Sequence, residues 1–215
     1  MNKIFSEHED LLLWSGGVDS TAILLNMLDE GINPDLLAIN EINCIEKTKN
    51  ESEKKARKNI KYFIENRYNV ELNLKEINNT IEFKGDYNNF TQIIIWLFAS
   101  LFNLKNTYKT VNLGILENEF RSNGKILYDN IFDNAFKLIS SSDQIDIIPK
   151  LTFPLEWYTK IDVIENFYNV NEFTRKLFHY TSSCQNPNPD LTPCLKCHSC
   201  KLRKGLSKLL IKRSL

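Results

Sequence analysis

Apolar and polar positions alternate along this chain with two different periods, which predict short strands followed by longer helices. Short apolar or alternating runs predict strands at residues 11–14, 35–40, 70–77, 111–116 and 145–148. Apolar positions three and four residues apart predict helices at residues 20–30, 51–66, 89–104, 126–140 and 201–213. Because strands and helices take turns, we predict an α/β fold: a doubly wound, mostly parallel sheet with helices on both faces.

One break interrupts this order near Ser182, where QNPNPDLTP consists mainly of loop-forming residues. We therefore expect an α/β domain over residues 1–180 and a cysteine-bearing loop with a final helix over residues 181–215. The final helix carries leucines at helical spacing, at positions 202, 206, 209 and 210. This spacing predicts that the helix packs on the same domain.

Composition and charge set limits on the class of protein. The 215 residues suffice for one α/β core with a small appendage. The 27 basic residues balance the 27 acidic ones, which gives no support for a nucleic-acid coat or a membrane surface. The most apolar window, 93–102, is shorter than the roughly 20 residues of a membrane span. The N-terminus lacks the apolar core of a signal peptide, so we expect a cytoplasmic protein.

The segment LLLWSGGVDSTAILL, at residues 11–25, changes from a strand pattern to a helix pattern across two glycines. In an open parallel sheet, ligands bind beyond the carboxyl ends of the strands. Gly16 and Gly17 allow successive N–H groups to point at one anion, and the start of a helix adds its dipole. Ser15, Ser20 and Thr21 supply hydroxyl donors. The segment therefore predicts a cradle for an anion.

A simpler interpretation is a helix start in which glycine makes the turn and Ser or Asp caps the helix. The hexapeptide SGGVDS, between an apolar strand and an apolar helix, also resembles the SGGxDS signature of PP-loop ATP pyrophosphatases. It is not the Walker loop, which ends in Gly-Lys-Ser/Thr. The resemblance implies that ATP is cleaved between its α and β phosphates, with Asp19 orienting the loop or helping to hold Mg²⁺ on the nucleotide.

Four of the five cysteines crowd together with the spacing Cys-x9-Cys-x2-Cys-x2-Cys, at Cys184, Cys194, Cys197 and Cys200. In a reducing compartment, such a cluster indicates a bound metal rather than disulfides. Four thiolates suit a tetrahedral Zn²⁺ ion, which would be structural because no coordination position is open. His198 could replace one cysteine, and an iron–sulfur cluster also takes four thiolates, so both remain alternatives.

Four segments, in order along the chain, resemble the 7-cyano-7-deazaguanine synthases of the queuosine pathway, which are PP-loop enzymes with a C-terminal four-cysteine zinc site. SGGVDST matches the ATP loop, and GILENEF (114–120) resembles the family's Gly-Val-x-Glu-x-Asp-Phe segment. FPLEWYTK (153–160) resembles its TPL…K segment, and SC…PCLKCHSCKLR matches its terminal cysteine motif, with Arg203 in place. The resemblance implies an adenine nucleotide α-hydrolase-like fold.

The resemblance also implies the reaction. It indicates an ATP-dependent ligase that adenylates 7-carboxy-7-deazaguanine, amidates it with ammonia and then forms the nitrile. The implied cofactors are structural Zn²⁺ and Mg²⁺ with ATP, and the implied partners are ATP, ammonia and a carboxylate small molecule. A membrane or nucleic-acid partner is not expected, and a homodimer is left open.

Site residues follow from the same resemblance. The predicted catalytic residues are Asp19, Ser20 and Lys160, the last as the cation for the leaving pyrophosphate or the α-phosphate. The predicted ATP-binding residues are Trp14, Ser15, Gly16, Gly17, Val18, Asp19, Ser20, Thr21, Asn40 and Gly114. The predicted substrate-binding residues are Glu117, Glu119 and Arg121, and the predicted metal ligands are the four clustered cysteines.

Two departures from the family pattern leave the acceptor open. Where the family has Val-Pro-Gly/Ala-Arg-Asn, this chain has FKGDYNNFTQIII (83–95), without the proline or the arginine. Glu119 also replaces the family's aspartate. One alternative is a paralogue that adenylates another carboxylate, including one on a macromolecule in a phage or defence context.

Two further alternatives belong to other classes. A PP-loop sulfurtransferase that thiolates tRNA usually needs reactive cysteines beside the ATP site, and Cys44 alone fits this poorly. A zinc-stapled binding module would hold a nucleotide and touch nucleic acid with its basic tail. Release of pyrophosphate from ATP would distinguish the enzymes from the binding module, because a binding module releases none.

Overall fold

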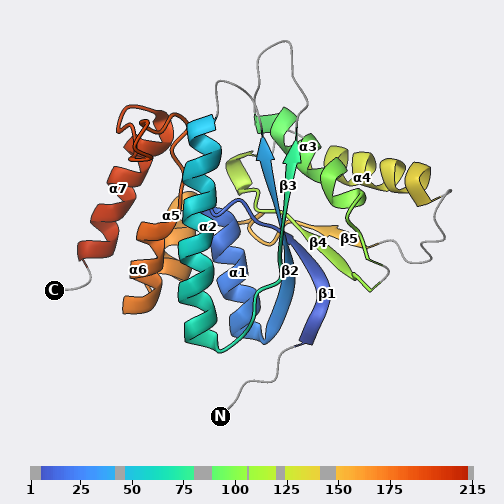
Figure 1. The fold of residues 1–215 in the computed structure, drawn as a ribbon, viewed down its shortest axis with the longest axis horizontal. Coiled ribbons are helices and arrows are strands. Elements are labelled where there is room, and N and C mark those ends of the chain that lie inside the picture. Colours follow the sequence, from blue (N-terminus) through green and yellow to red (C-terminus); the bar gives the residue numbers. More distant parts are fainter. Residues whose placement is uncertain are drawn as a thin grey trace.

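The computed structural model describes residues 6–41, 47–79, 89–105, 107–119, 124–140 and 149–212. Its centre is a five-stranded parallel sheet with the strand order β3-β2-β1-β4-β5 (Figure 1). The strands are β1 (Ser6–Leu13), β2 (Ile32–Glu41), β3 (Leu74–Asn79), β4 (Thr110–Asn112) and β5 (Lys150–Thr152). The chain order reverses at β1, which pairs with both β2 and β4, so the sheet is doubly wound. The predicted fold class is confirmed.

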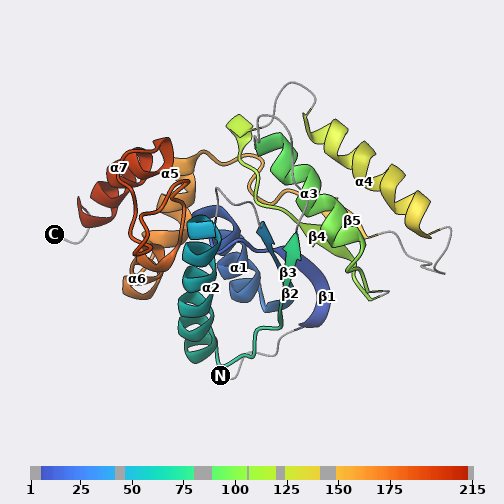
Figure 2. The ribbon, with the colours of Figure 1, turned by 45° about the horizontal axis from the view of Figure 1, so that its top comes forward.

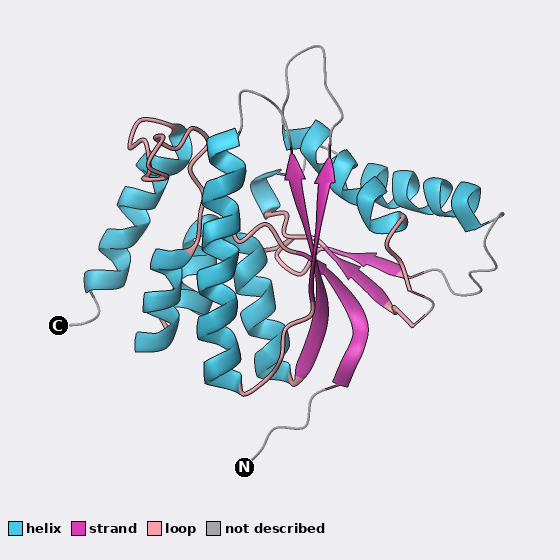
Figure 3. Cartoon of the chain, viewed as in Figure 1, coloured by secondary structure: helices cyan, strands magenta, loops and turns pink. Residues whose placement is uncertain are grey.

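Helices cover both faces of this sheet (Figures 1 and 2). They are α1 (Val18–Glu30), α2 (Lys47–Tyr68), α3 (Asn89–Leu101), α4 (Gly124–Ser140), α5 (Lys160–Val163), α6 (Glu172–Tyr180) and α7 (His198–Lys212). A 3₁₀ turn η1 (Glu117–Glu119) follows β4, and a π-helical turn η2 (Ile164–Tyr168) continues α5. Helices α1, α2 and α5–α7 lie on one face, and α3 and α4 lie on the other (Figure 3). No helix in the described ranges is long and apolar enough to cross a membrane.

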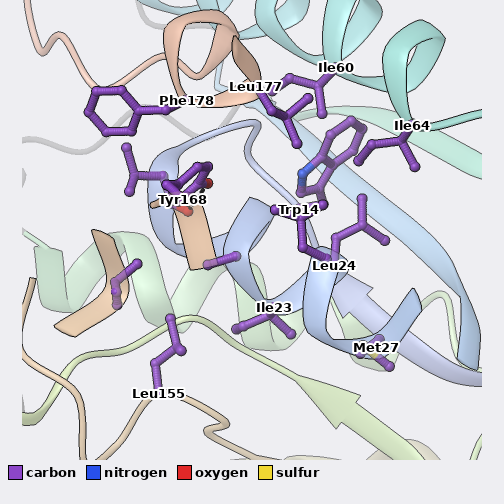
Figure 4. Packing of buried hydrophobic residues seen from close by; sticks show 14 of the residues in the cluster. Trp14, Ile23, Leu24, Met27, Ile60, Ile64, Leu155, Tyr168, Leu177 and Phe178 are labelled. Carbon is purple, nitrogen blue, oxygen red and sulfur yellow. Dashed lines mark hydrogen bonds between the residues drawn. The ribbon is translucent and has the colours of Figure 1, made fainter. Parts of the chain in front are cut away.

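Each face of the sheet has its own hydrophobic core, because successive side chains of a strand point to opposite faces. Along β1 and the residue that follows it, Leu12 and Trp14 enter one core, whereas Leu11 and Leu13 enter the other. Figure 4 shows Trp14 among Leu24, Ile60, Ile64 and Leu177, which come from α1, α2 and α6. The first core therefore joins the N-terminal strand to the C-terminal helices, including Leu206 and Leu210 of α7.

Apart from the strand predicted at 145–148, the predicted elements are present, with differences at their ends. Strand β1 begins earlier than predicted, because its polar residues pair with β2 across an irregularity between Glu7 and Leu11. Strand β4 ends at Asn112 rather than at residue 116, since η1 begins at Glu117. Gly31 caps α1 in the left-handed region, as its position predicted. Helices α5 and α6 were not predicted, because a π-helical turn interrupts their periodicity. The strand predicted at 145–148 lies outside the described residues.

Candidate active site

The predicted anion loop leaves the carboxyl end of β1 and enters α1 at Val18. Gly16 has a φ of +79°, in the left-handed region that favours glycine. Gly17 is the N-cap residue of α1 and has no side chain with which to cap the first N–H groups. Val18 is buried, and its carbonyl oxygen accepts a hydrogen bond from the Tyr168 hydroxyl at 2.6 Å. The start of α1 therefore offers N–H groups and a helix dipole to an anion.

Close packing requires both glycines of the loop. A Cβ atom on Gly16 would lie 2.8 Å from Cγ of Arg57, which is closer than real Cβ contacts. A Cβ atom on Gly17 would lie 3.1 Å from Oγ of Ser15 and 3.4 Å from the carbonyl oxygen of Ser182. The loop is thus held between α2 and the segment that precedes Cys184.

Arg57 of α2 fixes the loop, and this residue was not among the predicted site residues. Its side chain is 1% exposed. Nη1 donates to the carbonyl oxygen of Ser15 at 3.2 Å, Nη2 to Oδ1 of Asn40 at 2.6 Å, and Nε to Oε1 of Glu76 at 2.9 Å. The guanidinium group therefore connects the loop to the carboxyl end of β2 and to the middle of β3. Its spacing of three residues from the buried Ile60 was a usable sequence signal, because it places Arg57 on the apolar face of α2.

Hydroxyl groups stabilise the loop from two sides. Oγ of Ser15 accepts from the N–H of Gly17 at 3.2 Å and lies 3.2 Å from Oγ of Ser20. The indole N–H of Trp14 donates to Oγ1 of Thr21 at 3.1 Å, and both side chains are fully buried. Trp14 and Thr21 therefore position the loop from within the core, and neither residue is exposed to a ligand in this structure.

The structure brings together two predicted catalytic residues, Lys160 and Asp19, that are far apart in the sequence. Lys160 is the first residue of α5, whose start is fixed by a capping box between Thr159 and Asp162. Its Nζ atom donates to both carboxylate oxygens of Asp19, at 2.5 Å to Oδ1. Each side chain is about one fifth exposed, at 21% and 22%. The ion pair thus lies at the first turn of α1 and remains accessible to a ligand.

Glu119 approaches this ion pair from η1. Its Oε2 atom accepts from the N–H of Leu116 at 3.0 Å. Desolvation raises the pKa of the Glu119 carboxyl group above its usual value, the Leu116 N–H lowers it, and the charge of Asp19 raises it further. The charge of Lys160 lowers the pKa of Glu119, so both members of the ion pair influence this carboxyl group. The group belongs electrostatically to the same site.

Gly114 and Glu117 lie on the β4 side of the loop. A Cβ atom on Gly114 would lie 3.3 Å from the backbone nitrogen of Ser20, so the glycine allows this segment to pack on the start of α1. The N–H of Glu117 donates to the carbonyl oxygen of Tyr158 at 3.3 Å, which connects η1 to the turn before α5. Three segments therefore meet here: the glycine loop with the start of α1, the segment from Gly114 to η1, and the turn before α5.

The remaining predicted residues divide into one that joins the site and others that cannot be placed. Asn40 lies near the carboxyl end of β2, where its Nδ2 atom donates to Oδ1 of Asn78 at 3.2 Å. Arg121, Cys44 and residues 83–88 lie outside the described residues, whereas the rest of the segment at 83–95 forms the first part of α3. The side of the site that the altered family segment would form is thus not described.

The four clustered cysteines form a second centre. Their sulfur atoms all lie within 4.8 Å of one another. The Sγ atoms of Cys194 and Cys200 are 3.9 Å apart. Backbone N–H groups of Cys197 and Lys196 lower the pKa of the Cys194 thiol to about 6, which favours the thiolate form that metals bind. His198 is not part of the cluster of ligand atoms found among the described residues, so the cysteines could hold a metal by themselves.

A short segment connects the cysteine cluster to the glycine loop. The N–H of Ser182 donates to the carbonyl oxygen of Gly16 at 3.0 Å, and the Ser182 and Ser52 hydroxyls lie 3.1 Å apart. Arg203 of α7 donates to Oγ1 of Thr181 at 2.9 Å and to the carbonyl oxygen of Phe178. A pocket separates α2 from this segment; its lining includes Ser52, Lys55, Asn59, Tyr180, Ser182 and Arg203.

Comparison with known proteins finds one matching family model and several matching solved structures. A solved structure of the U34-tRNA thiolase NcsA from Methanococcus maripaludis, with its [4Fe-4S] cluster, matches with a TM-score of 0.48 and 13% sequence identity. The match covers 97% of this chain and 66% of the thiolase, so the chain spans less than two thirds of that protein. No curated protein matches the chain.

The family model described as "Queuosine biosynthesis protein QueC" matches residues 67–209, which is more than half of the chain. The matched range contains Gly114, Glu117, Lys160 and all four clustered cysteines, whereas the glycine loop and Arg57 precede it. In the structure, both are hydrogen-bonded to residues of the matched range: Gly16 to Ser182, and Arg57 to Glu76. The chain belongs to the QueC family, a group of ATP-using PP-loop enzymes.

Proposed function

We propose that the protein is an ATP-dependent carbon–nitrogen ligase that converts 7-carboxy-7-deazaguanine into 7-cyano-7-deazaguanine. The observation that carries the proposal is the glycine loop, which leads into an uncapped helix start beside the Lys160–Asp19 ion pair in a chain of the QueC family. Helix N–H groups next to a lysine suit the phosphates of a nucleotide.

The proposed reaction uses two ATP molecules. In the first half, the acceptor carboxylate attacks the α-phosphate of ATP, and pyrophosphate leaves. Ammonia then attacks the acyl carbon of the adenylate, AMP leaves with the bonding electron pair, and an amide remains. In the second half, the amide oxygen attacks the α-phosphate of a second ATP, and pyrophosphate leaves. The amide nitrogen then loses two protons, and AMP departs with the carbon–oxygen bonding electrons to give the nitrile. The protein aligns the reactants and stabilises the charge that develops on the phosphates.

The residues at the start of α1 receive distinct roles in this proposal. The N–H groups that follow Gly17 bind phosphate oxygens, and the hydroxyls of Ser15 and Ser20 donate to them. Lys160 exchanges part of its contact with Asp19 for the α-phosphate or the leaving pyrophosphate. Asp19 then contributes to holding the Mg²⁺ ion that accompanies ATP. The ion pair thus keeps both charges compensated until the nucleotide arrives.

The two flanks of the loop bind the rest of the substrates. Asn40, held by Arg57 near the end of β2, borders the adenine or ribose. Glu117 and Glu119, on the other flank, accept hydrogen bonds from N–H groups of the acceptor base. What supports this division is the sheet topology, which places β2 and β4 on opposite sides of β1.

We propose that the cysteine cluster holds structural zinc and that residues 181–215 form a metal-stapled part on the same domain. A Zn–S bond of about 2.3 Å in a tetrahedron separates the sulfur atoms by about 3.8 Å. The 3.9 Å between the Cys194 and Cys200 sulfur atoms supports a single ion. In an iron–sulfur cluster, different thiolates bind different iron atoms, which needs wider spacing. Elemental analysis should find one zinc per chain; iron with inorganic sulfide would contradict the assignment.

The proposed reaction is tested by incubating the protein with Mg·ATP, ammonium and 7-carboxy-7-deazaguanine. Mass spectrometry should detect the amide and then the nitrile, together with AMP and pyrophosphate. Omission of ammonium should leave the carboxylate unconverted. If ATP is cleaved to pyrophosphate while neither amide nor nitrile forms, the proposed acceptor is wrong.

A second candidate is a paralogue that adenylates a different carboxylate, including one on a macromolecule. The observation that favours it is the sequence FKGDYNNF, which lacks the proline and arginine of the family element, together with Glu119 in place of aspartate. This candidate predicts exchange of labelled pyrophosphate into ATP that 7-carboxy-7-deazaguanine does not stimulate. Stimulation by that compound would exclude it.

A further inference from the structure

Trp157 is an exposed aromatic residue beside the proposed active site, and none of the roles assigned above includes it. Its exposed fraction is 79%, whereas Trp14 and Trp96, the other tryptophans, are 0% and 5% exposed. A single exposed apolar residue is ordinary on a protein surface. The position and rigid support of Trp157 give it a more specific meaning.

The backbone that carries Trp157 is firmly held. The N–H of Glu156 donates to the carbonyl oxygen of Phe153 at 3.0 Å, and that of Tyr158 donates to the carbonyl oxygen of Leu155 at 3.0 Å. Phe153 and Leu155 are buried in opposite cores of the sheet. Lys125 of α4 forms an ion pair with Glu156. The chain thus presents the indole outward from a fixed turn, so little backbone entropy is lost when a ligand binds it.

Two kinds of polar group flank this turn. The carbonyl oxygen of Tyr158, the next residue, accepts from the N–H of Glu117, so η1 runs alongside the turn. Lys160, three residues after Trp157, contacts Asp19 at the first turn of α1. The turn that carries Trp157 therefore lies between η1, which carries Glu117, and the start of α5, which carries Lys160. Ile161, four residues after Trp157, is also exposed.

We propose that the Trp157 indole is the stacking platform for the acceptor, and that the acceptor is a flat heterocyclic base with N–H donors on one edge. An aromatic side chain binds the face of such a base, and a carboxylate accepts hydrogen bonds from its N–H groups. Trp157 supplies the first contact and Glu117 the second, while Lys160 lies near the carboxylate–phosphate junction. This inference rests on the proposed function for the identity of the base, and it adds the residue that recognises the ring.

The inference is tested by binding measurements without ATP, which separate recognition from chemistry. The probe is 7-carboxy-7-deazaguanine, titrated against the full chain by calorimetry and by tryptophan fluorescence. Binding to wild type should quench the solvent-exposed component of the fluorescence. Trp157→Leu should weaken binding by about 5- to 150-fold, the range for loss of one base–aromatic stack, and Trp157→Phe should keep it within about fivefold of wild type.

A matched control is Phe102→Leu, which removes another exposed aromatic ring, 72% exposed, just beyond the end of α3. That variant should bind the probe as wild type does. ATP binding should be unchanged in Trp157→Leu, because the proposed role of the indole is to bind the acceptor and not the nucleotide.

The outcomes distinguish this inference from the proposed reaction. If wild type binds the base and Trp157→Leu does not, but no nitrile forms, the platform stands and the reaction is wrong. If the nitrile forms and Trp157→Leu binds the base with unchanged affinity, the reaction stands and the platform is overturned. A wild type that does not bind the base also overturns the platform.

Discussion

The glycine loop (residues 15–17) and the cysteine loop (residues 184–197) are both irregular segments, but different interactions hold them. The glycine loop has a glycine, Gly16, at its one residue in the left-handed region. Hydrogen bonds hold the loop from both sides, because Arg57 donates to the carbonyl oxygen of Ser15 and Ser182 donates to that of Gly16. The cysteine loop places two leucines, Leu191 and Leu195, at φ values of 66° and 60°. A leucine in that region stores strain unless its surroundings impose the conformation.

This difference shows where the order of each segment comes from. Packing against Arg57 and Ser182 preorganises the glycine loop, so the groups that we propose to bind phosphate are in place before a nucleotide arrives. In the cysteine loop, four sulfur atoms converge, and a metal bound to them would offset the strain of the two leucines. The two loops are joined through Ser182, two residues before Cys184, so such a metal would also support the glycine loop from one side.

Removal of the metal should produce the largest effect, because metal-binding free energy acts as folding free energy in such sites. With a chelator, residues 184–212 should lose protection in hydrogen-exchange mass spectrometry, whereas the sheet should keep it. ATP affinity should fall as well, since Ser182 would no longer be held against Gly16. As a control, His198→Ala should retain the metal, because the four sulfur atoms form the cluster without it. Equal loss of protection across the whole chain would contradict the division between the two loops.

Substitution of Lys160 should reduce the rate without loosening either loop. Lys160→Met removes the cation that we propose to stabilise charge on the phosphates, and we expect kcat to fall by about 10²- to 10³-fold. Stability should change little in comparison, because the Asp19 partner is partly exposed. The control is Lys176→Met, which removes an exposed lysine from α6. A Lys160→Met variant with wild-type kcat would show that this lysine does not act on the phosphates.

A side chain at Gly16 should disrupt the glycine loop and leave the cysteine loop intact. Gly16→Ala places a Cβ atom against Arg57 at a positive φ, and we expect it to destabilise the fold by about 1–3 kcal/mol and to abolish measurable ATP binding. Urea denaturation and calorimetry measure the two effects. Gly205→Ala is the matched control: its Cβ meets no atom within 4 Å, and an alanine in a helix should stabilise α7 by about 0.5–1 kcal/mol. Equal ATP affinity in Gly16→Ala and wild type would refute the role of the loop.

The smallest expected effect concerns Glu119, whose pKa is raised in the folded protein. A carboxyl group with a folded pKa above its unfolded value opposes folding once it ionises. The penalty is absent below the ordinary value of 4.5 and complete above the folded pKa. Glu119→Gln should therefore be slightly more stable than wild type at neutral pH, and the difference should vanish as the pH falls below that value. Thermal unfolding at several pH values measures this; a difference independent of pH would contradict it.

The sequence predicted the parts of the molecule whose local pattern is strong. The strand–glycine–helix transition at Gly16 and Gly17 and the spacing of the four cysteines led directly to the two centres. Arg57 was missed because the partners of its buried guanidinium group, Ser15, Asn40 and Glu76, come from segments that only the tertiary fold brings together. The contact of Lys160 with Asp19 depends on α5, which a π-helical turn hid from periodicity. Such long-range pairings are decided by tertiary packing rather than by local sequence.

The most direct test of the glycine-loop role is to identify the products of ATP cleavage. The full chain, with Mg²⁺, ammonium and 7-carboxy-7-deazaguanine, should convert ATP into AMP and pyrophosphate, which phosphorus NMR resolves. Production of ADP and phosphate, or no consumption of ATP by a protein that also fails to bind it, would contradict α-phosphate activation at the start of α1.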